Sequence, residues 1–272
     1  MIELLAKSSD GLQLGSIAEA VSMPKSGVHR LLAQLIDVDM VRHDAENGRY
    51  FLTLRLLSLA FGHLGHIGVA DAAQPILDSL ARESGELVRL AVVESGRLIW
   101  VAKAQGSKSG LIYDPQMGMA AQLSCTASGQ AWLAELSDEE AMRLVSEQGF
   151  GLPPEFGPRA PKSVVELLGR LADCRRLGFA RVVDSSAVGM SAIAAAVVHP
   201  NRGVVLGVVS VGGPSLRLTE ERLERLAEPT LDAARKLAEF CSASPYLLSA
   251  HPLMPGKRPA MIRRHDLGGE DG

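Results

Sequence analysis

The sequence holds little of several features that would assign a class at once. Its 272 residues include three cysteines, Cys125, Cys174 and Cys241, which are widely spaced and odd in number. Such cysteines indicate neither a disulfide framework nor a metal site. No apolar run approaches the ~20 residues needed to cross a bilayer, and no signal-peptide pattern follows Met1. We therefore expect a cytoplasmic protein with no membrane association, no metal and no cofactor.

A strong excess of charge of either sign is also missing. The formal net charge is -3 at pH 7, which excludes a general attraction to nucleic acid or to an anionic membrane. Apolar residues make up 47% of the chain, enough for a proper core. The length allows one large domain or two modest ones.

The stretch SIAEAVSMPKSGVHRLLAQLI predicts two short helices near the N-terminus. Ser16 and Glu19 have the spacing of a capping box, so the first helix is expected to begin at Ser16. Ser22 and Met23 interrupt it. Pro24 suits the first turn of the next helix, because its missing N–H would have no partner there.

The second helix is predicted to have two different faces. Apolar residues recur every three or four positions and predict a buried face made of Val28, Leu31, Leu32, Leu35 and Ile36. The other side carries short donors and two cations, namely Lys25, Ser26, His29, Arg30 and Gln34. The N-terminal end of a recognition helix meets base edges and phosphates in the major groove, so this side is a candidate DNA-binding surface.

A small β-hairpin is predicted directly after the helices. Residues 41–43 and 49–52 are strand-like, and the segment between them ends in Asn47-Gly48, a strong turn signal. Arg42 and Arg49 would flank a wing lying over the DNA backbone. Two helices followed by such a hairpin form a winged helix-turn-helix.

A protein-interaction module would explain the same elements. Residues 1–55 hold six basic and seven acidic side chains, a net charge of -1 rather than the basic excess of many DNA-binding domains. The cations do cluster on the second helix and the wing. From the residues alone, both interpretations stay open.

The run PKSGVHRLL and the wing NGRYF closely resemble the DNA-binding region of IclR-type bacterial transcriptional regulators. The likeness continues through VRLAVVESGRLIWVAKAQG, CTASGQAWLA and RRLGFARVVDSSAVGMSAIAAAVVHPNRGVVLGVVSVGGP, and covers residues 2 to 240. Two departures stand out. Gly27 belongs to the predicted DNA-binding positions of the second helix but occupies a place commonly held by Thr or Ser, which implies the loss of one phosphate or base contact. Family members usually carry several more residues before this first helix, which implies a misannotated or clipped start.

The resemblance implies an α+β fold with two domains. A winged helix-turn-helix at 1–55 would be joined by a linker helix at 56–70 to a GAF-like antiparallel-sheet effector-binding domain at 71–242. The composition of 243–272, rich in Pro, Gly and charge, predicts a disordered tail. As an alternative, its Lys257-Arg258 and Arg263-Arg264 pairs could touch DNA or a partner. The sequence pattern of the second domain agrees with such a mixed fold. It predicts helices at 72–84, 163–177 and 219–241 and strands at 87–93, 98–104, 193–198 and 204–211.

Three segments rich in small residues, 123–129, 188–192 and 210–213, are candidates for a ligand pocket. Tight packing would explain their glycines and serines equally well. The family's pocket is built from the matching segments, so the resemblance implies effector contacts from Leu123, Ala127, Ser128, Met190, Ala192, Ser210 and Gly212. Ser124, Gln130, Val182 and Ala192 stand where family members often have more polar groups. We therefore expect a less polar pocket and a compact organic acid, aliphatic or aromatic.

An enzyme is the alternative. Cys125 lies beside a predicted helix start, where the pKa of a thiol can fall. A sensor or enzyme-like domain with Cys125 as its reactive residue and no DNA role is therefore a second interpretation. No His–Asp partnership and no phosphate loop are visible in the sequence, so we do not expect an enzyme.

The resulting hypothesis is a ligand-responsive DNA-binding regulator. Two chains, or a dimer of dimers, would present their recognition helices to a near-palindromic operator. Lys25 and Arg30 would contact phosphates or guanine, Ser26 and His29 would refine base choice, and Arg42 and Arg49 would anchor the wing. The effector would bias the DNA-competent state through a helix over 54–69.

Overall fold

The structure is a computed structural model that describes residues 1–56, 58–59, 69–115, 117–150 and 156–241. The chain separates into two compact units, Met1–His66 and Ile67–Gly272. This division falls inside the predicted linker at 56–70. Most of that linker helix and the whole of the predicted tail at 243–272 lie outside the described residues.

The first unit is a winged helix-turn-helix. Its elements are α1 (Ile2–Ala6), β1 (Leu12–Gln13), α2 (Leu14–Ala20), α3 (Lys25–Asp37), β2 (Val41–Asp44) and β3 (Arg49–Leu52). The strands form an antiparallel sheet in the order β1-β3-β2. A small core joins the helices to the sheet and consists of Leu5, Ile17, Ala18, Val28, Leu32, Val41 and Tyr50.

Two details of the helix prediction are wrong. Helix α2 begins at Leu14 rather than Ser16, and no side chain caps it, because β1 runs directly into the helix through Gln13. Leu31 is 37% exposed although its spacing placed it on the buried face. It lies at the margin of the apolar stripe, whose centre is filled by Val28 and Leu32, both fully buried.

The predicted hairpin is confirmed, and its strands pair with Val41 opposite Leu52 and Asp44 opposite Arg49. The carboxylate of Asp44 accepts hydrogen bonds from Asn47 Nδ2 at 2.9 Å and from Glu46 N–H at 3.0 Å. These bonds, that from Asn47 foremost, lower the pKa of Asp44. Gly48 has φ +64°, a conformation that an L residue rarely adopts, so glycine is favoured at this position of the turn.

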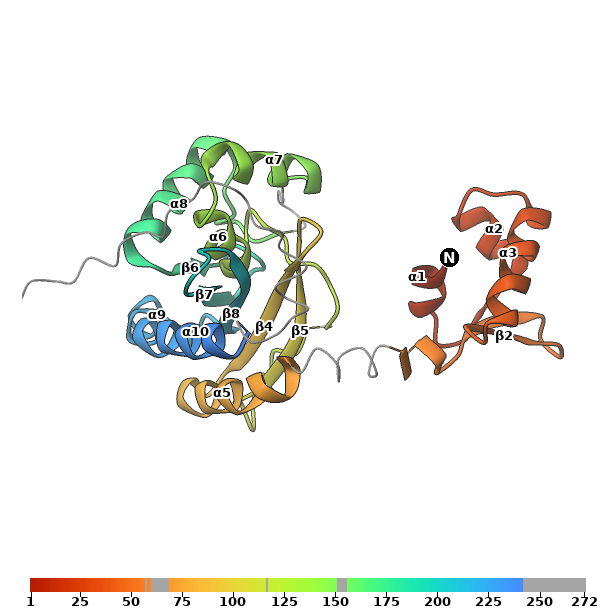
Figure 1. Cartoon of the computed structure of the whole chain (residues 1–272), viewed down its shortest axis with the longest axis horizontal. Helices are drawn as coiled ribbons and strands as arrows, with labels where there is room; N and C mark the ends of the chain where they lie inside the picture. Colours follow the sequence, from red (N-terminus) through yellow and green to blue (C-terminus); the bar gives the residue numbers. More distant parts are fainter. Residues whose placement is uncertain (57, 60–68, 116, 151–155, 242–272) are drawn as a thin grey trace, which may run out of the picture. The chain divides into compact units, whose positions relative to one another are not determined.

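The second unit is built on a five-stranded antiparallel sheet (Figure 1). In sequence order its strands are β4 (Leu87–Glu94), β5 (Arg97–Gln105), β6 (Ala180–Val183), β7 (Met190–Val198) and β8 (Val205–Pro214). Their spatial order is β5-β4-β8-β7-β6. The strands β7 and β8 run longer than the sequence pattern predicted, and the additional residues include Met190, Ala192 and Gly212.

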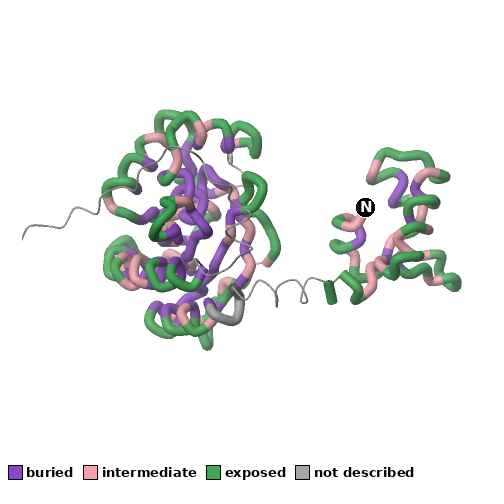
Figure 2. Tube along the Cα trace, viewed as in Figure 1, coloured by how far each residue is buried: buried purple, intermediate pink, exposed green. Residues whose placement is uncertain are grey.

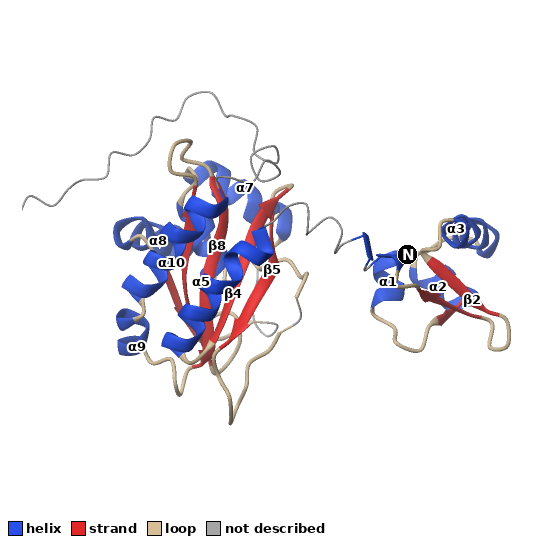
Figure 3. Cartoon of the chain, turned by 60° about the horizontal axis from the view of Figure 1, so that its bottom comes forward, coloured by secondary structure: helices blue, strands red, loops and turns tan. Residues whose placement is uncertain are grey.

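Helices cover both faces of this sheet (Figure 3). The helices of the unit are α5 (Val69–Ser84), α6 (Ala127–Ala134), α7 (Asp138–Gln148), α8 (Val164–Leu177), α9 (Glu220–Arg225) and α10 (Ala227–Cys241). Helices α5 and α10 pack on one face, whereas α6 and α8 lie over the other. The strands between them are largely buried (Figure 2). The expected α+β fold is confirmed, and GAF-like remains a prediction.

Local signals place most helix ends correctly. Ser163 caps α8 by accepting from Glu166 N–H, and Gly178 ends it in the left-handed conformation with φ +81°. The predicted helix over 219–241 is instead two helices, which break at Leu226. Pro229 has no N–H to offer the carbonyl of Arg225, so the hydrogen bond that would join the two helices there cannot form.

Candidate DNA-binding surface and effector pocket

Helix α3 presents a polar surface to solvent. Lys25, Ser26, His29 and Arg30 are all exposed. Ser26 and Arg30 are four residues apart and therefore lie on one side of the helix, opposite the buried Val28. No side chain caps the first N–H groups of α3, so they are free to bind an anion such as a phosphate.

Gly27, the departure from the family pattern, is not forced by packing. A Cβ at this position would meet only Met23 Cε, at an ordinary contact distance of 3.6 Å. The backbone of Gly27 is helical, and the residue is half-buried. A Thr or Ser would therefore fit here, and Gly27 as a DNA contact stays a prediction.

The two arginines of the wing have different surroundings. Arg42 is exposed, and its guanidinium lies 4.1 Å from the centroid of the Phe51 ring. Arg49 is half-buried, and its Nη1 donates to the carbonyls of Asp10 at 3.2 Å and Gly11 at 3.1 Å. Arg49 thus fastens the wing to the loop before β1. Its guanidinium is less free to contact DNA than that of Arg42.

In the second unit, a partly open cavity of about 50 Å³ lies between the sheet and the first turn of α6. Six of the seven predicted effector residues line it, which brings together segments more than 80 residues apart in sequence. The complete lining is Arg89, Trp100, Tyr113, Thr126, Ala127, Ser128, Ser186, Met190, Ser191, Ala192, Ser210 and Gly212.

Leu123 does not line the cavity, and its role as an effector contact stays a prediction. It is 1% exposed and belongs to the apolar core around Trp132. Its backbone instead supports α6: a Cβ on Gly129 would lie 2.3 Å from the carbonyl oxygen of Leu123. A residue with a side chain would not fit at position 129, because the helix packs directly against this loop.

Sequence reasoning missed Arg89, the only charged residue of the cavity lining. Arg89 is 9% exposed, and its guanidinium carbon lies 3.7 Å from the centroid of the Trp100 ring and 5.8 Å from that of Tyr113. Burial lowers the pKa of Arg89. A lone charge within the apolar strand LVRLAVV was the available signal, because such a residue is rarely buried without a partner.

The cavity contains hydrogen-bond donors that lack acceptors. Arg89 Nη1 and Trp100 Nε1 are both buried, and neither has a hydrogen-bond partner in the part of the chain that the structure describes. None of the lining residues is acidic. The first turn of α6, with Ala127 and Ser128, adds the positive end of a helix dipole. The cavity is therefore suited to an anion, and it is more polar than the sequence led us to expect.

At the other positions where family members often have more polar groups, the side chains pack or form hydrogen bonds inside the domain. Gln130 Nε2 donates to the carbonyl of Ser124 at 2.8 Å, and both residues are buried. Val182 is 3% exposed and packs in the apolar core below α6. These side chains stabilise the loop and helix that border the cavity without lining it.

Cys125 is placed where it cannot act as a nucleophile. It is fully buried, and burial raises the pKa of its thiol to about 12. It does not line the cavity. Its carbonyl accepts a hydrogen bond from Ser185 Oγ at 2.7 Å, which joins two loops beside the cavity. Cys125 is thus a packing residue.

We expect Cys125 in the folded protein to resist iodoacetamide across pH 7 to 9. With a pKa of about 12, roughly one thiol in ten thousand is ionised at pH 8. The raised pKa also means that the thiol's contribution to stability is lost as the pH rises from about 9 towards 12. Mass spectrometry of alkylated peptides, with the urea-unfolded chain as control, measures the rate. Labelling of the folded chain that levels off near pH 8 would contradict this assignment.

Among the described helices, none combines the length and the apolarity needed to span a membrane. Likewise, the described His, Cys, Asp and Glu residues form no group of three or more that could hold a metal ion.

Comparison with known proteins identifies both units. Residues 1–45 match the IclR helix-turn-helix domain, and residues 61–239 match the family described as bacterial transcriptional regulator IclR C-terminal. The HTH-type transcriptional repressor AllR of Escherichia coli K12 is 27% identical over 252 residues, covering 93% of this chain and 89% of the relative.

Solved structures show the same fold. An IclR transcriptional regulator from Alicyclobacillus acidocaldarius gives a TM-score of 0.76 at 23% identity, over 89% of this chain and 96% of that one. An IclR homolog from Microbacterium hydrocarbonoxydans, solved with 4-hydroxybenzoate, gives 0.70 at 20% identity, over 89% and 98%. Since the matching family profiles extend over most of the sequence, this chain belongs to the IclR family, whose members are DNA-binding transcriptional regulators rather than enzymes.

Proposed function

We propose that this regulator senses a small carboxylic acid in the cavity beside α6 and changes its affinity for operator DNA in response. The observation that carries the proposal is the buried guanidinium of Arg89, with an unpaired Nη1 in a partly open cavity that has no acidic residue. Burying a cation without an acidic partner is costly, whereas a bound carboxylate would pair with it.

The cavity also indicates the size and shape of the effector. A carboxylate could accept from Arg89 Nη1 and from Trp100 Nε1, while Met190, Ala192 and Gly212 supply apolar contacts. At about 50 Å³ the cavity is smaller than the ~150 Å³ that holds a benzene ring. An acid of a few carbons therefore fits directly, and an aromatic acid requires side chains such as Tyr113 to move. The complex of the Microbacterium homolog with 4-hydroxybenzoate supports an acid as the effector class.

On the DNA side, the exposed face of α3 would enter the major groove. Lys25, Ser26, His29 and Arg30 offer donors to bases and phosphates, and Arg42 would contact the backbone from the wing. Two chains related by a two-fold axis, or a dimer of dimers, would match a near-palindromic operator. Such a role places the protein in the cytoplasm with the chromosome.

For the two sites to communicate, the acid must bind one of two states of the protein more tightly than the other. The segment at 56–70 joins the two units in the chain and is the only covalent route between them. An acid that binds the DNA-competent and DNA-incompetent states with different affinities would shift DNA binding by that ratio.

A paired binding experiment tests this function. The full chain is titrated with its own promoter region and with a random duplex at low ionic strength, with and without acetate, propionate, benzoate or 4-hydroxybenzoate. Thermal shift compares each acid with its neutral amide. We expect a preference for the promoter duplex and stabilisation by acids alone. Failure to bind either duplex refutes the DNA role, and stabilisation only by sugars or cations refutes the proposed effector class.

A further inference from the structure

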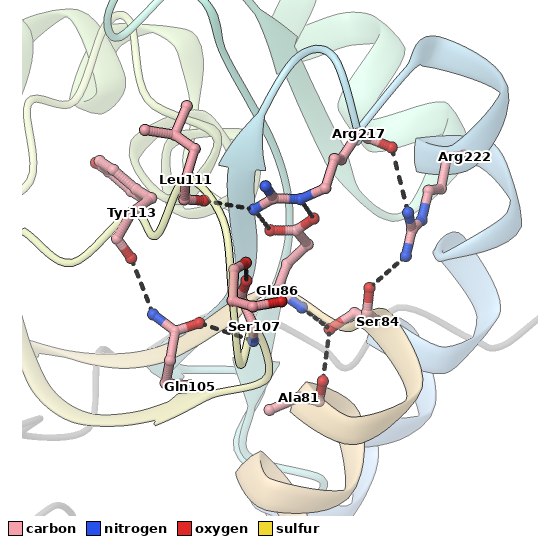
Figure 4. A network of polar contacts seen from close by, with 10 residues as sticks. Ala81, Ser84, Glu86, Gln105, Ser107, Leu111, Tyr113, Arg217 and Arg222 are labelled. Carbon is pink, nitrogen blue, oxygen red and sulfur yellow. Dashed lines mark hydrogen bonds and ion pairs between the residues drawn. The ribbon is translucent and has the colours of Figure 1, made fainter.

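Glu86 and Arg217 form an ion pair in which the carboxylate is buried and the guanidinium is partly exposed (Figure 4). Neither residue lines the effector cavity. Glu86, between α5 and β4, is only 2% exposed. Its two carboxylate oxygens accept from Arg217 Nε at 2.6 Å and from Arg217 Nη2 at 2.8 Å. This bidentate geometry fixes the plane and position of the guanidinium.

The same guanidinium reaches the segment that carries Tyr113. Arg217 Nη2 also donates to the carbonyl of Leu111 at 2.9 Å (Figure 4). The side chains of Leu111 and Ile112 are 65% and 47% exposed, so apolar burial contributes little to holding this segment in place. Two residues after Leu111, the Tyr113 side chain forms part of the cavity wall.

The segment also contacts β5 and β4. Gln105 Nε2 donates to the carbonyl of Tyr113 at 3.1 Å, and Lys103 pairs with Asp114 at 2.5 Å. The Lys103 pair is exposed, and such pairs contribute little to stability. The Tyr113 ring lies 5.8 Å from the guanidinium carbon of Arg89 in β4. The hydrogen bond from Arg217 links the backbone of the segment to the loop that follows β8.

Glu86 also touches β8 beside the cavity. A Cβ on Gly213 would lie 2.4 Å from Glu86 Oε2, so the carboxylate packs directly on the strand next to Gly212, which lines the cavity. One buried carboxylate thus places Arg217 in a fixed relation both to β8 and to the Leu111 carbonyl.

We infer that Arg217, held by Glu86, is a positioning residue that keeps Tyr113 in the wall of the effector cavity and thereby limits access to Arg89 and Trp100. The inference rests on the proposed use of this cavity as the effector site. Arg217 itself does not touch the effector. Its removal opens the wall and speeds exchange of a bound acid.

Two variants separate this role from general stability. Arg217→Lys keeps a cation beside Glu86 but cannot donate to both carboxylate oxygens and to Leu111 at once. The double variant Glu86→Gln with Arg217→Gln removes both charges, so no buried charge is left unpaired. Arg222→Gln is the matched control. Arg222 donates to the carbonyls of Ser84 at 2.6 Å and Arg217 at 3.4 Å.

Access to Trp100 gives a readout that does not depend on the effector. The chain has two tryptophans, and a Trp132→Phe background leaves Trp100 as the only one. We expect quenching of its fluorescence by iodide and by acrylamide to rise ~3- to 10-fold in both Arg217 variants, as expected when a charge-assisted hydrogen bond is lost. Arg222→Gln should leave quenching unchanged.

If Trp132→Phe does not fold, the full chain labelled with 5-fluorotryptophan provides the same information by ¹⁹F NMR, with Trp100→Phe to assign the signals. A changed melting temperature with unchanged access to Trp100 in both Arg217 variants would overturn the inference.

Benzoate titration of the unsubstituted chain tests the effector role separately. Increased access to Trp100 without benzoate or propionate binding supports the positioning role but not the proposed effector. Acid binding with unchanged access supports the effector but not the positioning role.

Discussion

Arg30→Ala is expected to lower the affinity for operator DNA ~10- to 100-fold at fixed salt, because one arginine contact to a guanine edge contributes about 1–3 kcal/mol. Arg30 is exposed in α3, on the side opposite the buried Val28. Its removal should not affect folding, since the side chain lies outside the core of the winged helix-turn-helix. Fluorescence anisotropy with an operator duplex measures the change.

Lys7→Ala is the matched control, because it removes one cation from the same unit but lies outside α3 and the wing. The salt dependence then distinguishes two kinds of contact. If Arg30 contacts a base, the variant loses sequence preference and keeps its salt slope. If it contacts a phosphate, affinity falls equally on all duplexes and the slope drops by ~0.9. Equal affinities of Arg30→Ala and Lys7→Ala would refute the assigned role.

Arg89→Met is expected to weaken acid binding on the order of 100-fold and to raise the melting temperature of the unliganded protein. Hydrogen bonds to charged groups contribute ~1.5–3 kcal/mol each, and Arg89 offers several donors. Without ligand, however, the guanidinium is a buried cation with an unpaired nitrogen, and replacing it by an apolar side chain of similar length removes that cost. Thermal shift and calorimetric titration with propionate and benzoate measure both effects.

Opposite changes in stability and affinity are the signature of a residue kept for binding. Arg97→Met is the control, because Arg97 is exposed at the start of β5, opposite Glu94, and does not line the cavity. It should change neither property. Stabilisation of Arg89→Met by the acids as strong as that of the unsubstituted chain would exclude Arg89 as the carboxylate partner. Unchanged DNA affinity in the absence of acid would show that the variant remains folded.

Signals confined to a few neighbouring residues predicted the local structure well. The Asn47-Gly48 turn, the Ser163 cap and the Gly178 stop were all confirmed, because each depends on backbone geometry within one turn. The capping box at Ser16 was wrong because a two-residue strand, which no local pattern marks, sets the start of α2. A single proline, Pro229, was enough to divide the final helix.

The sequence by itself determined three features, because each follows from the spacing of residues along the chain. They are the polar and apolar faces of α3, the wing, and the alternation of helices and strands. The cavity that we propose as the effector site was decided by tertiary structure. Antiparallel pairing of β4 with β5 and β8 places Arg89 opposite Ser210 and next to the Trp100 ring, residues that are 11 to 121 positions apart. A lone arginine in an apolar strand can lie beside water, beside an acidic partner or in a cavity that offers no acceptor. Which of these occurs depends on the strands that pair with it, and that pairing forms only when distant segments pack together.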